Sequence, residues 1–358
     1  MKRTFSRRSF LLTLGALMAG CRPADPAAPT IYAPGNASIP PPVIPTATTF
    51  MRPSPQSTST IPLGVPITDT EQLYLNSYRP TPDVSNWSLS INGLVDRPLT
   101  LSIADIHALP AVTVMRTLEC IGNPVGGGLI GNVNWTGVAL SDLLSRVGVQ
   151  TGATYVHFKA ADEYTTSVKL EWLTQPGVML VYAVNGNPLP PEHGYPLRLL
   201  IPGLYGQKQP KWITQITFMD HDVLGYWEGP DYAWSNMATV KTNSQITKPY
   251  RKANFTDPLR IEGLAYAGDR AITRVEISTQ GNTKDALWHA ATLIKPPSSL
   301  AWTWWVYDWS PPAPGTYILA VRAADETGFT QSERETGTVS DVFPNGTAAI
   351  HETPLTLS

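Results

Sequence analysis

Cys120 is the residue of this chain best suited to redox or metal chemistry, and it lies in the run TLECIGN. The only other cysteine, Cys21, lies in an N-terminal export signal. A lone cysteine in an exported protein has no internal disulfide partner, so it is either a packing residue or a reactive or metal-binding thiolate. Glycines and asparagines crowd the segment after it, which predicts a loop that approaches another group closely. We therefore favour the thiolate.

Two later segments carry cations and glycines that suit an anionic, phosphate-bearing ligand. His193 and Arg198 lie in HGYPLR, and Gly203, Gly206 and Lys211 lie in PGLYGQKQPKW. A guanidinium binds phosphate as a bidentate fork, and an ammonium binds it as a point charge. Glycines allow backbone N–H groups to approach the anion. Taken singly, Arg198 and Lys211 are each better explained by ordinary ion pairing.

The N-terminus predicts export. Arg7-Arg8 precede a short apolar run from Phe10, which fits a twin-arginine signal and is too short to span a membrane. The run LMAGC resembles a lipoprotein processing site, so residues 1–21 are expected to be a signal that leaves Cys21 lipidated; ordinary cleavage is the alternative. Residues 22–66 hold twelve prolines and predict a disordered tether. We expect a periplasmic or cell-surface protein held to the membrane by its lipid anchor only.

Composition excludes several function classes. The formal net charge is −2 and the pI is about 6.3. The chain therefore lacks the overall positive charge that is typical of proteins that bind nucleic acid. The sequence has no CxxCH haem-attachment motif, no HExxH zinc motif and no GxGxxG dinucleotide motif. Any electrons must then pass to or from a separate partner.

The elements that position these residues fall into two parts. In 67–245, short helices are scattered among strands without regular alternation, which predicts an α+β domain. The helices are expected at 102–109 and 141–147, and the strands at 87–91, 154–160, 178–184 and 197–201. In 250–345 only short strands are expected, which indicates a β-sandwich. These strands are expected at 259–264, 272–278, 302–307, 317–323 and 336–342, with His289 and the nearby tryptophans as structural residues.

Together, these segments resemble the sulfite-oxidase family of molybdenum–pterin enzymes over roughly residues 67–345. The resemblance implies a molybdopterin-binding domain, followed by an immunoglobulin-like β-sandwich of the type through which the family dimerises. It implies that Cys120 is the one protein ligand of molybdenum. Tyr232, which follows Lys211 by 21 residues as in the family, becomes an active-site hydrogen-bond donor or proton relay. The implied cofactor contacts are His193, Arg198, Lys211, Tyr78, Asn123, Gly203 and Gly206.

The chain departs from true sulfite oxidases where the family binds its substrate anion. After Asn123 stands Pro124 instead of an arginine, and Asn76 and Tyr78 replace the arginine and histidine of the family's RNHxP segment. The loss of two cations weakens the case for a small dianion. We therefore expect Asn76 to face a substrate that is not sulfite in the usual mode, such as an S- or N-oxide.

Two alternatives remain from the sequence. One is sulfite dehydrogenase or oxidase proper, and the other is a non-catalytic, lipid-anchored binding module. In either enzymatic case the electron partner is expected to be a cytochrome or a quinol-linked subunit, because the chain lacks a haem motif.

Overall fold

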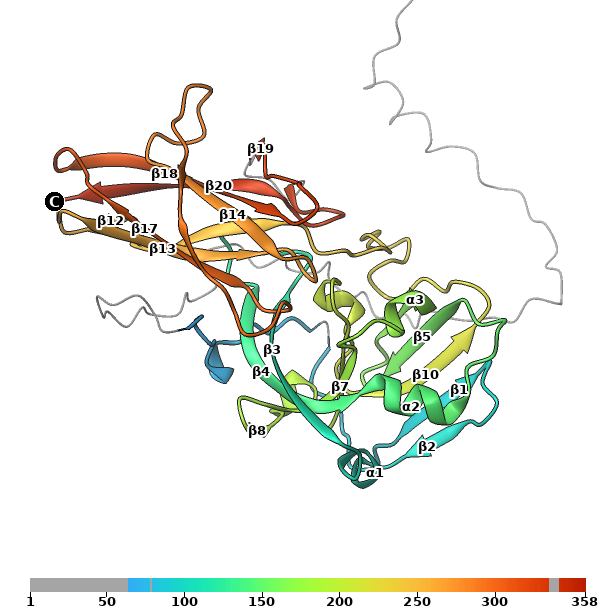
Figure 1. Ribbon diagram of the computed structural model, residues 1–358. Coiled ribbons are helices and arrows are strands. Elements are labelled where there is room, and N and C mark those ends of the chain that lie inside the picture. Colours follow the sequence, from blue (N-terminus) through green and yellow to red (C-terminus); the bar gives the residue numbers. More distant parts are fainter. Residues whose placement is uncertain (1–63, 78, 335–340) are drawn as a thin grey trace, which may run out of the picture. The chain divides into compact units, whose positions relative to one another are not determined.

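The computed structural model describes residues 64–77, 79–334 and 341–358 (Figure 1). The expected signal, nearly all of the expected tether, Tyr78 and most of the expected strand at 336–342 lie outside these residues. Among the helices of the described residues, none is both long enough and apolar enough to cross a membrane.

Two sheets form the N-terminal part of the described chain (Figure 1). A buried aliphatic core lies against them. The strands of the first sheet, in spatial order, are β2 (Leu99–Leu101), β1 (Leu89–Gly93), β10 (Ile213–Met219), β5 (Tyr155–Ala160) and β6 (Thr165–Lys169). The second sheet contains β3 (Ala111–Glu119), β4 (Ile130–Ala139), β7 (Met179–Val184) and β8 (Asn187–Pro188), with β9 (Arg198–Leu200) paired to β7. The strands expected from the sequence correspond to β1, β5, β7 and β9.

Both expected helices form, and local sequence explains where they begin or end. In α1 (Ile103–His107), the Ser102 hydroxyl caps the Asp105 N–H, and the Asp105 carboxylate accepts the Ser102 N–H at 2.8 Å. The second helix, α2 (Leu140–Val147), ends at Gly148, whose left-handed φ of 65° suits glycine. A further four-residue helix, α3 (Leu170–Leu173), and the 3₁₀ turns η2 (Thr70–Gln72), η3 (Pro191–His193) and η4 (Gly206–Lys208) complete this part.

The C-terminal part contains strands and no α-helix within the described residues, as expected for a β-sandwich. One sheet has the order β11 (Asn243–Lys248), β13 (Leu259–Tyr266), β17 (Thr303–Trp309) and β16 (Thr292–Ile294). The other has the order β12 (Lys252–Ala253), β20 (Ala349–Leu357), β18 (Gly315–Asp325), β14 (Ile272–Ser278) and β15 (His289–Ala290), with β19 (Glu333–Arg334) beside β20. Trp302, Trp304, Trp305 and Trp309 are buried, as expected for core residues. His289 is exposed and stacks on Tyr307, and its structural role stays a prediction.

The described chain is mostly β, so the α+β class expected for the N-terminal part is not confirmed. The α-helices of the described residues contain only five, eight and four residues. The longest ladder of the N-terminal part joins β3 to β4 in antiparallel register from Ala111↔Val138 to Glu119↔Ile130. Neither strand was expected from the sequence. Together they contain more residues than the other strands of the N-terminal part that were not expected.

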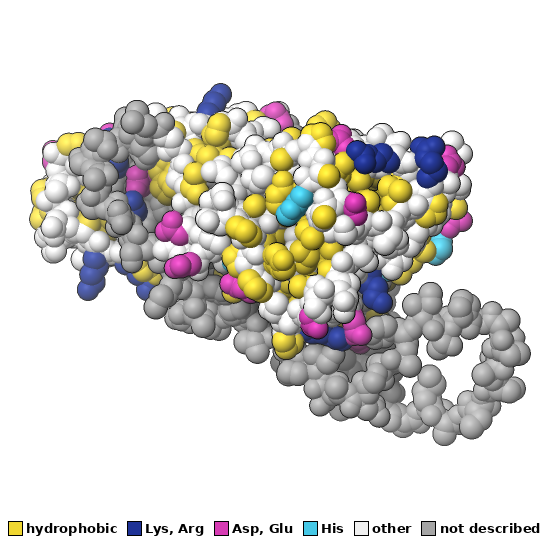
Figure 2. All heavy atoms as spheres, turned by 90° about the horizontal axis from the view of Figure 1, so that it is seen from below, with side chains coloured by type: hydrophobic (Ala, Val, Ile, Leu, Met, Phe, Trp, Pro, Cys, Tyr) yellow, Lys and Arg dark blue, Asp and Glu magenta, His cyan; other side chains and the backbone are white. Residues whose placement is uncertain are grey.

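The surface agrees with the small net charge. On the face shown in Figure 2, acidic and basic side chains are scattered among hydrophobic and uncharged ones, and no basic stripe appears.

Candidate functional site

Cys120 lies in the loop of the β3–β4 hairpin. Its N–H donates to the Leu129 carbonyl at 2.9 Å, and its own carbonyl accepts the Asn123 N–H at 3.0 Å. The side chain is 9 % exposed. Burial raises the pKa of the Cys120 thiol, while hydrogen bonds from the Gly122 backbone and from Asn76 act in the opposite direction. Asn76 donates from Nδ2 to the sulfur at 3.3 Å. The structure thus places together two residues that are 44 positions apart and were both predicted as site residues.

A buried carboxylate braces the Cys120 loop. Glu119 accepts hydrogen bonds from the Asn123 amide at 2.9 Å and from the Asn243 amide, at the start of β11, at 3.0 Å. The other end of the Asn123 side chain accepts the Leu129 N–H at 2.9 Å. Burial raises the pKa of Glu119 to about 7. The nitrogen and the oxygen of the Asn123 amide therefore both form hydrogen bonds within the hairpin. The predicted contact of Asn123 with a cofactor stays a prediction.

The predicted cations converge on one another. Arg198 is 4 % exposed, donates to the His193 carbonyl at 3.1 Å and lies over the Trp135 ring at 5.2 Å. Its Nε is buried without a hydrogen-bond partner. Burial and the nearby Arg198 charge lower the pKa of His193 to about 4, so the imidazole is neutral at pH 7. Lys211 is half-buried and donates to the Ser77 hydroxyl and to the Glu192 carbonyl.

Two residues that were not predicted from the sequence belong to this group. Arg116, on β3, is 2 % exposed, lies near Arg198 and donates to the Gln209 amide oxygen at 3.2 Å. The Tyr74 hydroxyl interacts with both the Cys120 sulfur and the Arg198 guanidinium, and burial raises its pKa well above the usual value. Within the described ranges, neither Arg116 nor Arg198 has a carboxylate at ion-pair distance. The sequence contains no motif that marks either residue as part of the site, because tertiary contacts between segments distant in the chain bring them there.

The two predicted glycines have different neighbours. A Cβ at Gly206 would lie 2.9 Å from the Tyr74 hydroxyl and 3.5 Å from the Glu119 carbonyl, so the backbone of Gly206 approaches the cysteine site closely. A Cβ at Gly203 would instead meet the Asp269 carboxylate at 2.8 Å. The structure therefore brings Gly206 to the site and Gly203 to the β13–β14 turn.

Tyr232 lies in an aromatic loop, residues 225–236. Its hydroxyl is 2.7 Å from the Tyr226 hydroxyl, and its ring is 5.0 Å from that of Trp227. The loop packs in one hydrophobic cluster with Ile121, the residue after Cys120. Trp234, at the end of the loop, lies against Gly122: a Cβ there would be 3.7 Å from its ring. The aromatic loop and the Cys120 loop are thus neighbours.

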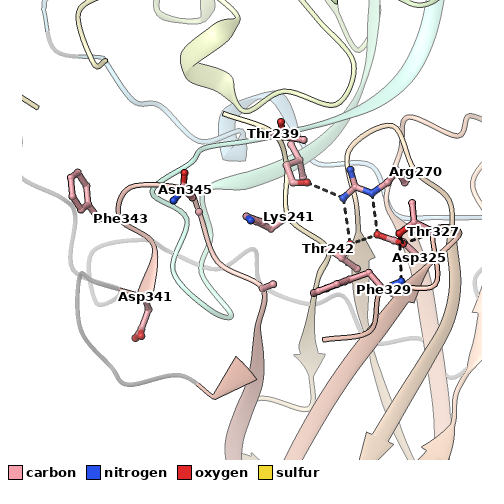
Figure 3. Close-up of a pocket in the computed structure, with 13 residues that line it drawn as sticks. Thr239, Lys241, Thr242, Arg270, Asp325, Thr327, Phe329, Asp341, Phe343 and Asn345 are labelled. Carbon is pink, nitrogen blue, oxygen red and sulfur yellow. Dashed lines mark hydrogen bonds and ion pairs between the residues drawn. The ribbon is translucent and has the colours of Figure 1, made fainter. Parts of the chain in front are cut away.

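A hollow of about 530 Å³ lies on the sandwich side and contains none of the predicted site residues (Figure 3). Along one wall, Arg270 donates to Asp325 at 3.0 Å and to the Val240 carbonyl at 2.9 Å. Burial raises the pKa of Asp325, but hydrogen bonds from Thr242, Thr327 and Arg270 outweigh it and lower the pKa to about 2. These groups satisfy one another, so this wall is a structural network.

Comparisons with known proteins identify both parts of the chain. The family described as "Oxidoreductase molybdopterin binding domain" matches residues 78–227, and "Mo-co oxidoreductase dimerisation domain" matches residues 234–347. The uncharacterized oxidoreductase YuiH of Bacillus subtilis (strain 168) is 37 % identical over 150 residues, which cover 42 % of this chain and 74 % of YuiH. The chain belongs to the sulfite-oxidase family of molybdopterin oxidoreductases. It is thus an oxidoreductase, and its cofactor is molybdenum-molybdopterin.

Longer relatives and one solved structure agree with this family. Sulfite oxidase of Arabidopsis thaliana is 28 % identical over 327 residues, 75 % of this chain and 82 % of the relative. Nitrate reductase [NADPH] of Fusarium oxysporum is 34 % identical over 266 residues, 60 % of this chain but only 29 % of the relative. The chain thus spans less than a third of that enzyme. Sulfane dehydrogenase SoxCD of Paracoccus pantotrophus superposes with a TM-score of 0.70 at 25 % identity, over 90 % of this chain and 92 % of that one.

The residues present fit this cofactor. Its phosphate needs cations, and Arg116 and Arg198 are buried cations without a carboxylate partner in the described structure. The unpartnered Arg198 Nε is a buried donor that an anion would satisfy. A soft thiolate suits molybdenum, and Cys120 supplies it. Tyr74 interacts electrostatically with both Cys120 and Arg198, so it lies between the thiol and the cations. The side chains of Arg116, Arg198, His193 and Lys211 would hold the phosphate end.

Anion binding by the apo-protein is expected to weaken as the pH rises. Burial and the neighbouring Arg198 lower the pKa of Lys211 to about 7, so its ammonium loses its proton above neutral pH. We expect the affinity for sulfate, whose charge is constant, to fall several-fold between pH 6 and pH 8.5, measured by isothermal titration calorimetry on protein made without pterin. Lys211→Arg, which keeps its charge, should flatten this dependence. An equally steep fall in Lys211→Arg would contradict the assignment.

Proposed function

We propose that this chain is an exported molybdopterin enzyme that transfers an oxygen atom to or from an uncharged substrate such as an S- or N-oxide. The surroundings of the Cys120 sulfur carry this proposal. Among the described residues, the sulfur accepts hydrogen bonds from the Gly122 backbone and the Asn76 amide. Glu119, Tyr74 and Tyr205 interact with it electrostatically, and none of these groups is a cation. A small dianion needs charge-assisted hydrogen bonds, whereas a neutral oxide needs only a donor such as an amide.

Two other cations, Arg79 and Lys208, form ion pairs with carboxylates of the protein. Arg79 pairs with Glu163 at 2.5 Å. Lys208 is fully buried in an ion pair with Glu228 at 2.8 Å. Both observations favour a substrate without formal charge.

The roles of the residues follow from their positions. When bound, the cofactor supplies the two-electron oxygen-atom chemistry. Cys120 is proposed as its thiolate ligand, which requires that the buried thiol lose its proton on metal binding. Asn76 holds a donor beside that sulfur and is proposed to orient the substrate oxygen. Tyr232 is proposed as the hydrogen-bond donor or proton relay, with its hydroxyl positioned by Tyr226.

Tyr232→Phe is expected to lower kcat about 10- to 100-fold, because general acid–base groups contribute on that order or more. The effect should be larger on kcat than on KM. Steady-state kinetics with a reduced viologen dye and dimethyl sulfoxide measures both quantities. Tyr195→Phe, at an exposed position, serves as a matched control. Unchanged kinetics in Tyr232→Phe would remove the relay from the proposal.

Oxidation of sulfite or of a sulfane-type sulfur is the second candidate. The structural similarity to sulfane dehydrogenase SoxCD over nearly the whole described chain favours it. A dye-reduction assay with sulfite separates the two: sulfite turnover at micromolar KM would favour this second candidate, and turnover of S- or N-oxides without it would favour the first.

The cellular setting forms part of the same proposal. The twin-arginine signal supports export of the folded, cofactor-loaded protein, and Cys21 supports lipid anchoring. The match of residues 234–347 to a dimerisation domain supports a homodimer. A separate cytochrome or quinol-linked subunit is proposed to exchange electrons with it.

A further inference from the structure

An ion pair in the interior connects the aromatic loop to the body of the N-terminal part. Lys208 Nζ lies 2.8 Å from Glu228 Oε1, and neither side chain is exposed. Lys208 ends η4, two residues after Gly206 of the cysteine site. Glu228 lies in the aromatic loop that carries Tyr232. The pair thus joins a segment beside the cofactor site to the segment that carries the proposed proton donor.

The Lys208 ammonium uses all of its hydrogens within the protein. Besides Glu228, it donates to the Ser167 carbonyl on β6 and to the Asn236 amide oxygen, each at 2.9 Å. An ammonium has three donors, so no hydrogen remains for an anion of the cofactor or substrate. Lys208 therefore fixes three segments of the chain relative to one another.

Glu228 is held from the body of the domain as well. Its Oε1 also accepts the Thr166 hydroxyl at 3.1 Å and the Gln207 amide at 3.2 Å. The Gln207 amide additionally donates to the Ser235 carbonyl at 2.8 Å, near the end of the aromatic loop. Both ends of the loop are thus tied to β6 and η4 through polar contacts.

The backbone of the loop places Glu228 between its aromatic residues. The Trp234 N–H donates to the Trp227 carbonyl at 2.9 Å, which closes the loop. The Tyr232 N–H donates to the carbonyl of Gly229, the residue after Glu228, at 3.1 Å. A shift of Glu228 would therefore move the backbone on which Tyr232 depends.

A buried ion pair contributes little net stability, because desolvation of both charges offsets their attraction, and apolar residues of similar volume often replace such a pair without loss. What it imposes is geometry, since each charge must meet its partner. We propose that Lys208 and Glu228 are positioning residues that hold the aromatic loop, and with it the Tyr232 hydroxyl, in its active arrangement. The catalytic consequence rests on the role proposed above for Tyr232.

The test removes both charges together, as Lys208→Met with Glu228→Leu, because one charge left alone would be buried without a partner. The readout is the ¹⁹F NMR signal of 3-fluorotyrosine placed at position 232, with molybdenum content and kcat as companions. We expect the single native signal to broaden or split while molybdenum per chain is unchanged, and kcat to fall at least tenfold at a similar KM. When Tyr232→Phe is added to this double variant, kcat should fall by less than a further threefold.

Two controls separate the possible causes. Removal of the exposed Arg260–Asp308 pair of β13 and β17, as Arg260→Met with Asp308→Leu, should leave the ¹⁹F signal unchanged. Lys208→Met with Glu228→Gln also leaves no buried charge and keeps the shape of the glutamate, so it provides the same readout if the first double variant does not fold.

A native ¹⁹F signal in the double variant, or in Lys208→Met with Glu228→Gln where only that variant folds, would overturn the proposal. If Tyr232→Phe alone has no kinetic effect, the role of Tyr232 fails instead, and the NMR result still decides whether the pair positions the loop.

Discussion

A Cys120→Ala variant is expected to lose turnover by at least about 100-fold, since even outer partners of metal ligands cost 10- to 100-fold when mutated. The side chains that would hold the phosphate end of the cofactor are unchanged in this variant. The pterin is therefore expected to remain bound while the metal loses its protein ligand. Initial rates with a reduced dye and saturating S-oxide, normalised to pterin content, measure the effect.

Cys21→Ser is the matched control for Cys120→Ala. Cys21 lies in the expected signal, so its loss should change membrane attachment and leave turnover per bound pterin unchanged. A Cys120→Ala protein with native turnover per pterin would mean that Cys120 is a packing residue.

Asn76→Arg is expected to change substrate preference toward anions. Asn76 donates to the Cys120 sulfur at 3.3 Å, and an arginine there would restore a cation that the family's substrate segment carries. A charge-assisted hydrogen bond contributes about 1.5–3 kcal/mol, so kcat/KM for sulfite should rise about tenfold or more. For dimethyl sulfoxide, kcat/KM should fall, because the larger charged side chain replaces the amide donor.

The comparison for this variant is Asn76→Gln, which lengthens the side chain without adding charge. It should lower turnover of the oxide without improving that of sulfite. Equal gains in kcat/KM for sulfite in Asn76→Arg and Asn76→Gln would show that charge is not what the site lacks. Efficient turnover of sulfite by the wild-type enzyme would contradict the proposed substrate class.

Local signals in the sequence predicted the elements that local interactions determine. The Ser102 capping box and Gly148 mark helix ends whose hydrogen bonds involve residues only a few positions apart. The turn-separated strands of the sandwich were predicted for the same reason. The sequence did not indicate β20, because it contains Pro354 and pairs with β18, whose residues lie 30 to 42 positions earlier.

The site was predicted from the sequence only where residues lie in a recognisable segment. Cys120, His193, Arg198 and Lys211 were proposed in this way. Arg116 was missed because the alternation along β3 does not reveal that its side chain lies near Arg198, 82 positions later. The role of Asn123 within its loop also depended on partners, Glu119 and Leu129, that only the folded hairpin identifies.

The most direct test of the account is molybdenum K-edge X-ray absorption, which counts the sulfur neighbours of the metal. Wild-type protein and Cys120→Ser, both loaded in a host that makes the pterin, are to be compared at equal molybdenum content. The account predicts one sulfur neighbour fewer in the variant. The same number of sulfur neighbours in both proteins would contradict it and would show that Cys120 does not bind the metal.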